Sequence, residues 1–363
     1  MIDILRDLIA IDSVNSSLVS GGAGEGEIAQ YIATKLRAMR IDAVIEEAAP
    51  GRPNVIAVIE GRSQGPSLML CGHSDTVGVE GMSAPFDPVE RDGRMYGRGA
   101  QDMKGGLAAI LGAAETLAKD GLRAGSVIIA IVADEEFASI GAEALVREWS
   151  ADAAVVAEPT DLMIGIGHKG FEWVEVIAGG VAAHGSRAED GVDAIAHMGR
   201  VLARLERLDQ SFHARPHPLL GRPSLHASLI HGGRELSTYP DRCTLQLERR
   251  TVEGEPPGVS LAEAEAILEE LRAEDPKFRA TARLMFTRSP YVTPEDHPLP
   301  RLLADAPRAA MSFWTDAAIL GAAGISSVVF GPGGAGLHGI DEYVRIDEVL
   351  ACRDALVRLA NEL

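Results

Sequence analysis

Six acidic or imidazole side chains lie where apolar runs or glycine-rich stretches of the chain end. They are His73, Asp102, Glu135, Glu136, Glu158 and His338. Burying an ion at such a place is costly unless it is paired, and a divalent cation offsets that cost directly. If the adjacent Glu135 and Glu136 are counted as one position, two imidazoles and three carboxylates form the mixed nitrogen and oxygen set that suits zinc and also accepts cobalt or manganese. Because Cys71 is the only cysteine near these positions, we expect a metal centre without a structural thiolate site.

The stretch from Leu68 to Asp75 shows how a predicted strand can place such groups at its C-terminal end. The apolar run from Leu68 to Cys71 ends in Gly72-His73-Ser74-Asp75. A buried strand therefore brings an imidazole and a carboxylate to its C-terminal end, where open α/β sheets bind ligands. Since strand side chains alternate, His73 and Asp75 share one face, and the carboxylate can hold the second ring nitrogen. Taken alone, this spacing is more typical of a surface turn.

The composition limits the classes of protein to which the chain can belong. With 363 residues and 46% hydrophobic content, it can bury a large core and is expected to form two domains. The net charge of −19, from 53 acidic and 34 basic residues, argues against a nucleic-acid partner. Cys71, Cys243 and Cys352 are widely spaced and odd in number, which indicates reduced thiols in a cytoplasmic protein. The first residues lack a signal-peptide pattern, and no apolar run of about 18 residues would span a membrane.

Hydrophobic periodicity predicts an α/β domain around the candidate ligands. Helices are predicted at the start of the chain, at 25–40 and at 104–119, because apolar residues recur there at helical spacing. Strands are predicted at 54–60, 68–71, 126–132 and 153–157. The last two are continuous apolar runs, which are typical of parallel strands buried on both faces. A helix predicted at 316–320 and a strand predicted at 326–330 show the same hydrophobic pattern as these elements. We therefore expect them to belong to the same domain, which is built on one central, mostly parallel sheet.

From about His168 the pattern changes to that of a second domain. The predicted elements are strands at 171–178, 224–230, 243–248 and 279–286 and helices at 192–208 and 261–271. Their β-α-β-β-α-β order is the split βαβ arrangement, which predicts a four-stranded antiparallel sheet with two helices on one face. We interpret it as an insertion, 169–286, into a catalytic domain made of 1–168 and 287–363.

Seven motifs occur along the chain in an order that resembles a known family. They are HSDTV, GRGAQDMKGG, ADEEF, AEPT, AAHGSRAEDGVDAI, GGRELSTYPDRCTLQLERR and GPGGAGLHG. The set resembles the M20 family of metallopeptidases and deacylases, which includes acetylornithine deacetylases and succinyl-diaminopimelate desuccinylases. The resemblance implies a metal-dependent exopeptidase-like catalytic domain with an inserted, ferredoxin-like α+β domain that acts as a lid and forms a homodimer.

The resemblance also implies how the ligands divide between two divalent ions. His73 and Glu158 correspond to the ligands of one ion, and Glu136 and His338 to those of the other. Asp102 corresponds to the carboxylate that bridges them, which suits two ions roughly 3.5–4 Å apart. In relatives the peptide bond after Asp102 is cis, and we expect the same here.

Two further acids correspond to supporting roles. Glu135 matches the general base, which takes a proton from water and hands it to the leaving amine. Asp75 matches the carboxylate that orients His73. Because adjacent residues of a strand point in opposite directions, Glu135 and Glu136 can both serve the site only if the strand opens into a loop before them.

Three residues of the inserted domain are predicted to act on the substrate. His184 corresponds to a histidine that donates to the oxyanion, and in relatives it reaches the active site of the partner subunit. Arg250 corresponds to an arginine that binds a substrate carboxylate, although a charge exposed at a strand end is the alternative. Ser237 stands where many relatives have asparagine, and Glu253 stands where they have proline. The connection 297–314 is also short for the family.

These observations predict hydrolysis of the amide bond of an N-acyl amino acid. A dipeptidase or aminopeptidase is the alternative within the same chemistry, because a metal centre attacks any suitably placed amide. A non-catalytic module that binds an amino acid or peptide is the alternative from another class, and the presence of Glu135 argues against it. Phosphate binding by GPGGAG is excluded, because neither a helix nor a lysine follows it.

Overall fold

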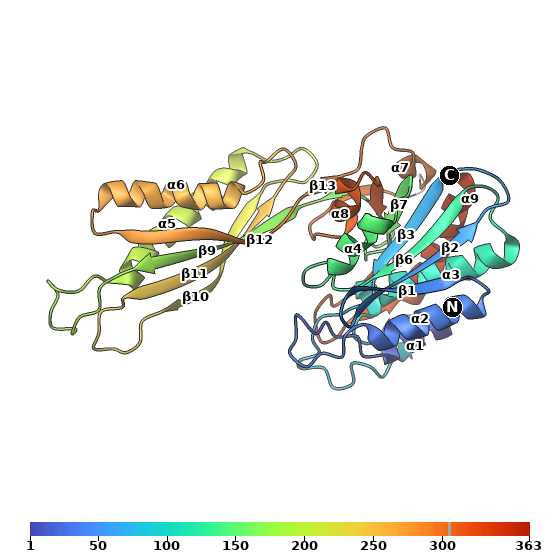
Figure 1. Cartoon of the computed structure of the whole chain (residues 1–363), viewed down its shortest axis with the longest axis horizontal. Coiled ribbons are helices and arrows are strands. Elements are labelled where there is room, and N and C mark those ends of the chain that lie inside the picture. Colours follow the sequence, from blue (N-terminus) through green and yellow to red (C-terminus); the bar gives the residue numbers. More distant parts are fainter. Residues whose placement is uncertain (304–305) are drawn as a thin grey trace. The chain divides into compact units, whose positions relative to one another are not determined.

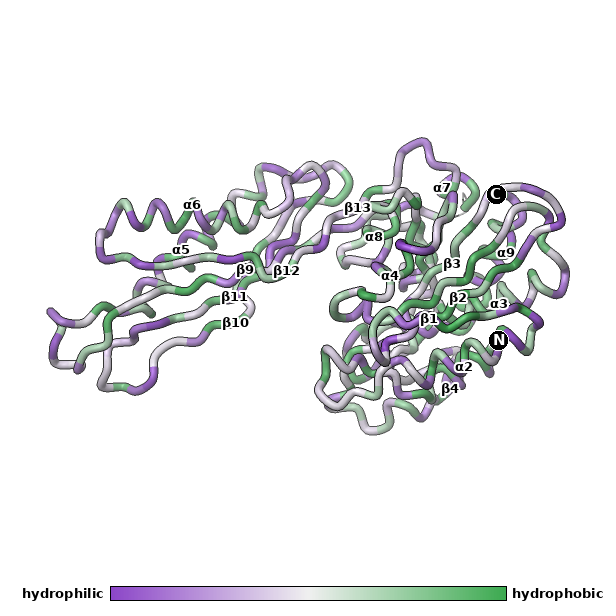
Figure 2. The backbone as a smooth tube through the Cα atoms, in the orientation of Figure 1, coloured by the Kyte–Doolittle hydropathy of each residue, from purple (hydrophilic) through white to green (hydrophobic). Residues whose placement is uncertain are grey.

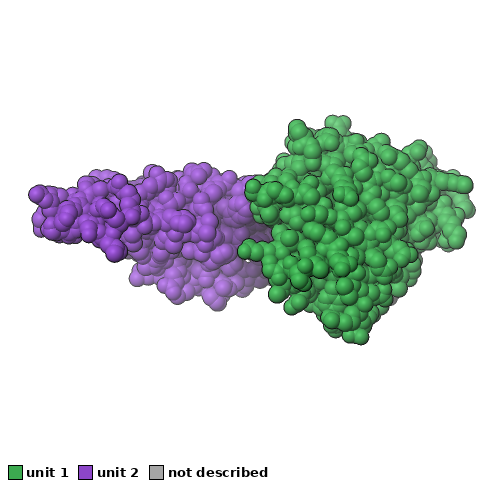
Figure 3. Space-filling view, turned by 90° about the horizontal axis from the view of Figure 1, so that it is seen from below, with its two compact units in different colours: residues 1–167, 293–311, 315–363 green, residues 168–292, 312–314 purple. Residues whose placement is uncertain are grey.

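A computed structural model describes residues 1–303 and 306–363 of the chain (Figure 1). Internal contacts divide it into two compact units (Figure 3). Unit 1 comprises Met1–Gly167, Thr293–Met311 and Thr315–Leu363, and unit 2 comprises His168–Val292 and Ser312–Trp314. Unit 1 is therefore assembled from segments that lie on both sides of unit 2 in the sequence.

A mixed sheet lies at the centre of unit 1. Its strands are β1 (Ala43–Ala49), β2 (Arg52–Glu60), β3 (Ser67–His73), β6 (Ser126–Val132), β7 (Ala153–Val156), β8 (Ile164–His168), β14 (Arg308–Met311) and β15 (Ser327–Val329). They follow the order β1-β2-β6-β3-β7-β15-β8, with β14 also paired with β8. The neighbours β6, β3, β7 and β15 run parallel. The pairs β1–β2, β2–β6 and β15–β8 run antiparallel.

The expectation of a mostly parallel sheet is therefore correct only for the four central strands. Pro50 and Gly51 are the only residues between β1 and β2, and Gly51 has a φ of 74°. So short a turn can join only antiparallel neighbours. The sequence pattern missed β1 because its residues are mostly half-exposed and include two glutamates. The sheet is mixed as a result.

Helices pack against this sheet through apolar side chains. They are α1 (Ile2–Ala10), α2 (Gly26–Ala38), α3 (Gly105–Asp120), α4 (Ile140–Glu148), α7 (Leu299–Leu302), α8 (Ala317–Ala322) and α9 (Ile346–Glu362). Leu107, Ile110, Leu111 and Leu117 recur at helical spacing on α3, and all are buried. Each such side chain contributes about 1.5–3 kcal/mol when it leaves water. Helix α3 packs against α1 and α9, and Figure 2 shows the continuous hydrophobic colour of β6.

A small second sheet in unit 1 brings two loops together. It consists of β4 (Val89–Arg91), β5 (Arg94–Tyr96), β16 (Gly334–Ala335) and β17 (Tyr343–Arg345), in the order β16-β17-β5-β4. The irregular turn η1 (Ala100–Lys104), in which Asp102 and Met103 have non-helical backbone angles, follows β5 and leads directly into α3. The register of β5 and β17 therefore places the segment before α3 beside the segment between β16 and β17.

Unit 2 has its own sheet and core. Its elements are β9 (Gly170–Gly179), α5 (Ala194–Ser211), the 3-10 helix η2 (Phe212–Ala214), β10 (Ser224–Gly232), β11 (Arg242–Thr251), α6 (Val259–Glu274), β12 (Arg279–Arg288) and β13 (Tyr291–Val292). The sheet order is β10-β11-β9-β12, and every pair is antiparallel. Val174, Val176 and Leu245 of the sheet are buried with Val201 of α5 and Leu268 of α6. The role of this unit as a lid and dimerisation domain stays a prediction.

Two further expectations concern the connection 297–314 and membrane-spanning helices. The connection 297–314 contains α7 and β14, but residues 304–305 lie outside the described residues. No helix within residues 1–303 and 306–363 has both the length and the hydropathy that a membrane span requires.

Candidate metal centre

The six groups predicted for the metal centre all lie in unit 1. His73 is the last residue of β3, and Glu158 follows the end of β7. Glu135 and Glu136 follow the end of β6, Asp102 lies in η1 before α3, and His338 lies between β16 and β17. Because β3, β6 and β7 are parallel neighbours, their carboxyl ends meet at one edge of the sheet and bring the following side chains together.

His73, Asp102 and Glu158 form a first ligand group. Their ligand atoms all lie within 4.8 Å of one another. His73 Nε2 is 3.0 Å from Asp102 Oδ1 and 3.7 Å from Glu158 Oε1. Atoms separated by such distances can each reach one ion at the roughly 2.0–2.2 Å typical of zinc with nitrogen and oxygen ligands.

Asp102, Glu136 and His338 form a second ligand group, again with ligand atoms within 4.8 Å of one another. His338 Nε2 is 3.4 Å from Asp102 Oδ2 and 3.3 Å from Glu136 Oε2. The two oxygens of Asp102 therefore face different imidazoles, Oδ1 facing His73 and Oδ2 facing His338. A carboxylate placed in this way can bridge two ions.

One side-chain atom provides a separate indication that the centre fits a cation. Glu136 Oε1 is buried and has no hydrogen-bond partner among the residues that the structure describes. A buried carboxylate oxygen without a partner is costly, and a cation would satisfy it. The nitrogen and oxygen donors of both groups fit zinc, and they also accept cobalt or manganese.

The pKa values at the centre reflect acidic side chains that are buried and closely spaced. Burial raises the pKa of Glu135 and of Glu158 well above the usual value, and neighbouring carboxylates add to this shift. A hydrogen bond with Asp102 raises the pKa of His338 to about 10. Burial lowers the pKa of His73, but Glu158 and Asp102 outweigh it and raise that pKa. A divalent ion bound among these groups would compete with protons for the same ligand atoms.

Glu135 lies beside the ligands without belonging to either ligand group. Its Oε2 atom is 4.0 Å from His73 Nε2, and its side chain is 12% exposed. Strand β6 ends at Val132, and Asp134 has a φ of 70°, which interrupts the alternation of the strand. The strand thus opens into a loop, as the sequence predicts, and both Glu135 and Glu136 turn toward the centre.

Asp75 organises the backbone of this loop. Its carboxylate accepts the backbone N–H groups of Glu135 and Glu136, each at 3.1 Å. The nearest partner of His73 Nδ1 is the backbone carbonyl of Asp75 at 2.9 Å, whereas the carboxylate Oδ1 is 3.5 Å away. The contact predicted for the carboxylate is therefore made mainly by the carbonyl group. The reason is that β3 ends at His73, so strand alternation does not extend to Asp75.

Behind Asp75 lies a buried polar network that sequence reasoning missed. Asn15 Nδ2 donates to Asp75 Oδ2 at 2.7 Å and to Asp134 Oδ1 at 3.0 Å. Arg52 donates to Asp134 Oδ1 at 2.7 Å and, through two nitrogens, to the carboxylate of Glu25. Buried polar groups that satisfy one another hold their members in one arrangement. Asn15, Glu25 and Arg52 lie outside the sequence motifs, and Asn15 is 119 positions from Asp134.

The segment that carries Asp102 enters α3 through an irregular turn. The peptide bond between Asp102 and Met103 is cis, as expected from the family resemblance. A Cβ atom at Gly106 would lie 2.1 Å from the carbonyl oxygen of Ala157. Only glycine allows α3 to begin so close to the end of β7, which explains the second glycine of the MKGG motif.

The residues predicted to act on the substrate, His184, Ser237 and Arg250, all lie in unit 2. His184 and Ser237 are exposed and belong to neighbouring segments, because Gly185 N–H donates to the Ser237 carbonyl at 2.7 Å. Arg250 lies near the end of β11, where its Nε donates to Glu248 Oε1 at 2.7 Å. The structure thus brings His184 and Ser237 together within unit 2.

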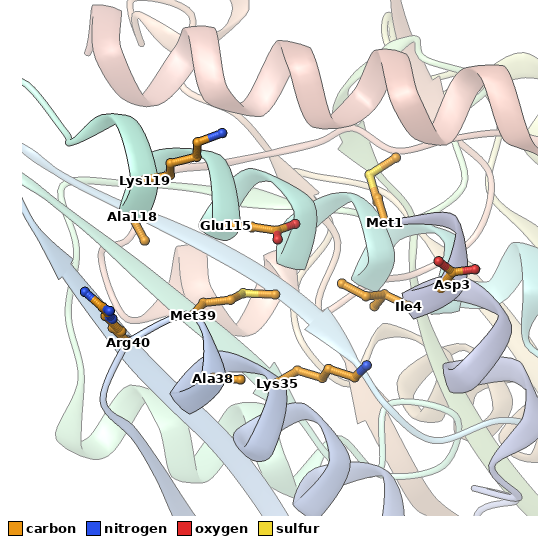
Figure 4. Close-up of a pocket in the computed structure, with 10 residues that line it drawn as sticks. All are labelled: Met1, Asp3, Ile4, Lys35, Ala38, Met39, Arg40, Glu115, Ala118 and Lys119. Atoms are coloured by element: carbon orange, nitrogen blue, oxygen red, sulfur yellow. The ribbon is translucent and has the colours of Figure 1, made fainter.

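A surface hollow between α1, α2 and α3 contains none of the predicted site residues. It is lined by Met1, Asp3, Ile4, Lys35, Ala38, Met39, Arg40, Glu115, Ala118 and Lys119 (Figure 4). Its charged side chains are mixed in sign and carry no imidazole. None of its lining residues belongs to either ligand group.

Comparisons with known proteins agree with this geometry. Residues 69–362 match the model of peptidase family M20/M25/M40. An acetylornithine deacetylase from Myxococcus xanthus is 32% identical over an alignment 382 residues long. The alignment covers 98% of this chain and 95% of the relative. The structure of a tripeptidase from Staphylococcus aureus matches with a TM-score of 0.82 at 20% identity, over 100% of this chain and 98% of that one. A dinuclear metal-binding peptidase of the M20 family from Bacillus subtilis matches with a TM-score of 0.76 at 18% identity, over 99% of this chain and 96% of that one.

The chain belongs to peptidase family M20/M25/M40 and is a metallo-hydrolase. The family predicted from the sequence motifs is thereby confirmed. The solved structures support the fold, a mixed α/β arrangement around a central mixed sheet. Because the matches include both a deacetylase and peptidases, family membership alone leaves the substrate open.

Proposed function

We propose that the chain hydrolyses the amide bond of an N-acyl amino acid with two divalent ions, for which zinc is the best fit. The ligands would be His73, Asp102, Glu136, Glu158 and His338. The observation that carries the proposal is the carboxylate of Asp102, whose two oxygens face two separate ligand groups. The relative from Myxococcus xanthus named as a deacetylase supports an acylated amino acid as the substrate.

The proposed reaction assigns the proton transfers to Glu135. When bound, the two ions would supply Lewis acidity toward the scissile carbonyl and the attacking water. Glu135 takes one proton from the water as its oxygen bonds to the carbonyl carbon. It then delivers that proton to the amide nitrogen as the C–N bond breaks, which leaves a free amine and a carboxylic acid that keeps the second proton of the water. Transfer of this second proton to the amine gives the carboxylate and ammonium products. Glu135 belongs to neither ligand group, so its carboxylate is available for both transfers.

His184 is proposed to stabilise the oxyanion of the tetrahedral intermediate. The Ser186 backbone N–H donates to His184 Nδ1 at 3.2 Å, and the Ser186 hydroxyl oxygen lies 2.8 Å from the same nitrogen. Because Nδ1 accepts this bond, the neutral imidazole carries its proton on Nε2. The exposed side chain therefore presents an Nε2–H donor, which is the form that an oxyanion requires.

A homodimer through unit 2 is also proposed. Strand β10 lies at the edge of the four-stranded sheet, and its residues Leu229 and Ile230 are 56% and 49% exposed. Leu236, in the segment that follows, is fully exposed. An open edge with apolar side chains is a liability that pairing with another strand removes. A two-fold contact with a second copy is the commonest solution.

Metal removal tests the proposed function directly. We expect about two divalent ions per chain by elemental analysis, loss of activity after chelation, and recovery with zinc or cobalt. The substrate panel contains acetyl, succinyl and formyl amino acids together with dipeptides, and cleavage of the acyl amino acids is expected. Preferential cleavage of dipeptides would instead assign the chain to peptidase chemistry. Full turnover by the metal-free protein would contradict the mechanism.

Arg250→Ala is expected to raise the KM for substrates with a free carboxylate by about 10-fold or more, because a charge-assisted hydrogen bond contributes roughly 1.5–3 kcal/mol. The kcat is expected to change little, since such a contact binds the ground state and the transition state alike. The matched control is Arg283→Ala, which removes another sheet arginine paired with a glutamate, Glu175, at 2.7 Å. An unchanged KM in Arg250→Ala would identify Arg250 as an ordinary exposed charge.

A further inference from the structure

Glu342 is a buried carboxylate that the proposed reaction does not use. It is 1% exposed. Its Oε1 atom accepts the backbone N–H groups of Gln101 at 2.9 Å and Asp102 at 3.2 Å. Its Oε2 atom accepts the backbone N–H of Gly99 at 2.9 Å and Nη1 of Arg98 at 2.6 Å. One side chain thus holds most of the segment that ends at the shared metal ligand.

The small sheet explains why Glu342 reaches this segment. Strands β5 and β17 pair antiparallel, and beyond that pair Gly97 N–H donates to the Glu342 carbonyl at 3.1 Å. The segment from β5 to Asp102 and the loop that carries His338 therefore meet at Glu342. Both the backbone carbonyl and the side-chain carboxylate of Glu342 therefore accept hydrogen bonds from the segment between β5 and Asp102.

The loop that carries His338 requires such an anchor. His338 has a φ of 58°, a left-handed conformation that is uncommon for residues other than glycine. A residue in this conformation keeps a single orientation only where its surroundings hold the loop. The His338 side chain is 54% exposed, so burial contributes little to holding it. Glu342, four residues further along the chain, is the buried end of the same loop.

We propose that Glu342 is a positioning residue that preforms the second ligand group. It fixes the backbone of Asp102 and anchors the loop of His338, so that both side chains converge with Glu136 on one ion. This inference rests on the proposed two-metal function. His73 and Glu158 are placed by the ends of β3 and β7 instead, so the first ligand group depends less on Glu342.

The experiment titrates metal-free Glu342→Gln with Co²⁺ and follows the visible absorption and the heat of binding. Glutamine has the same size, but its NH₂ group must face a backbone N–H in place of one acceptor oxygen. We expect the weaker of the two binding steps to lose at least about 10-fold in affinity, the usual effect of removing a partner of a metal ligand. The other step is expected to weaken less, because the group of His73 and Glu158 shares only Asp102 with the segment that Glu342 holds.

Glu348→Gln provides a matched control. Glu348 also accepts a backbone N–H, that of Gly333 at 2.7 Å, and also pairs with an arginine, Arg345. It lies close in sequence to Glu342 and holds Gly333, five residues before His338, so this control disturbs the same loop without changing the acceptor of the Asp102 backbone N–H. Both Co²⁺ steps are expected to match wild type in this variant. A loss equal to that in Glu342→Gln would mean that any disturbance of this region weakens the second group, which would overturn the specific role of Glu342.

Thermal melting of the metal-free proteins separates a positioning effect from unfolding. If Glu342→Gln does not fold, Glu342→Asp takes its place, because it keeps the charge and shortens the reach by one methylene. Selective weakening of one step in a folded variant supports the inference. Two steps of wild-type affinity in a folded variant overturn it, although the proposed function stands. A wild-type protein that binds fewer than two ions overturns the proposed function itself.

Discussion

Replacing Glu135 by glutamine is expected to lower kcat by at least about 10²-fold while both metal ions stay bound. Glutamine keeps the size and shape of the side chain but cannot accept a proton from the attacking water. Glu135 belongs to neither ligand group, and its Oε2 atom is 4.0 Å from His73 Nε2. The substitution therefore removes the base without removing a ligand. The measurement pairs kcat at saturating substrate with the metal content of the same preparation.

Glu136→Gln is the matched control, because it makes the same chemical change one residue further along. Glu136 Oε2 lies 3.3 Å from His338 Nε2 and belongs to the second ligand group. We expect this variant to lose one ion, whereas Glu135→Gln keeps two. If both variants retained metal equally, the division of roles between the neighbouring glutamates would be wrong. Full turnover by Glu135→Gln would exclude Glu135 as the base.

The ligands at strand ends could be predicted because their signal is local. His73 follows the apolar run at 68–71, and Glu158 ends the run at 153–157. A charge at the end of a buried strand is visible in a few consecutive residues, and parallel strands place such ends together. Asp102 and His338 have weaker local signals, because each follows a glycine-rich stretch rather than a strand, and the family motifs are needed to predict their roles as ligands. The structure brings all of them into two ligand groups.

The mixed character of the sheet could not be predicted in the same way. A strand is recognised by its own periodicity, whereas its direction depends on the partner it chooses and on the turn that leads to it. Strand β1 is half-exposed, so its apolar pattern is faint, and the two-residue turn at Pro50-Gly51 makes it antiparallel to β2. The antiparallel pair β2–β6 joins elements 66 or more positions apart, such as Glu60 and Ser126. Local periodicity contains no information on such a pairing.

The residues that hold the centre in place were missed for the same reason. Glu342 hydrogen-bonds with a segment 240 or more positions away in the sequence. Asn15 and Arg52 reach Asp134 across 119 and 82 positions. Each of these residues has an ordinary local context, and only the folded chain shows that its polar groups are buried and paired. Sequence reasoning therefore finds the groups that act on a substrate more readily than the groups that position them.

Mixing His184→Ala with Glu135→Gln is expected to restore activity that neither variant has alone. Loss of an oxyanion donor commonly costs roughly 2.7–4 kcal/mol, so each pure variant is nearly inactive. In the proposed homodimer each subunit lends its His184 to the partner's metal centre. A mixed dimer then has one centre with both Glu135 and a partner histidine intact. Random reassociation of equal amounts makes half of the dimers mixed, so activity should reach about a quarter of that of wild type.

The matched control replaces Glu135→Gln by the double variant Glu135→Gln/His184→Ala. A mixed dimer of that double variant with His184→Ala has an intact Glu135 in one subunit, but neither subunit carries the histidine. It should stay inactive even though the subunits exchange equally well. The measurement uses mixed dimers purified through a different affinity tag on each chain. In the mixed dimer of the two single variants one of the two centres is intact, so the purified mixed dimer should show about half of the activity of wild type. This dimer contains an intact Glu135 in one subunit and an intact His184 in the other. If such a dimer showed no recovery of activity, His184 would act within its own chain or not at all.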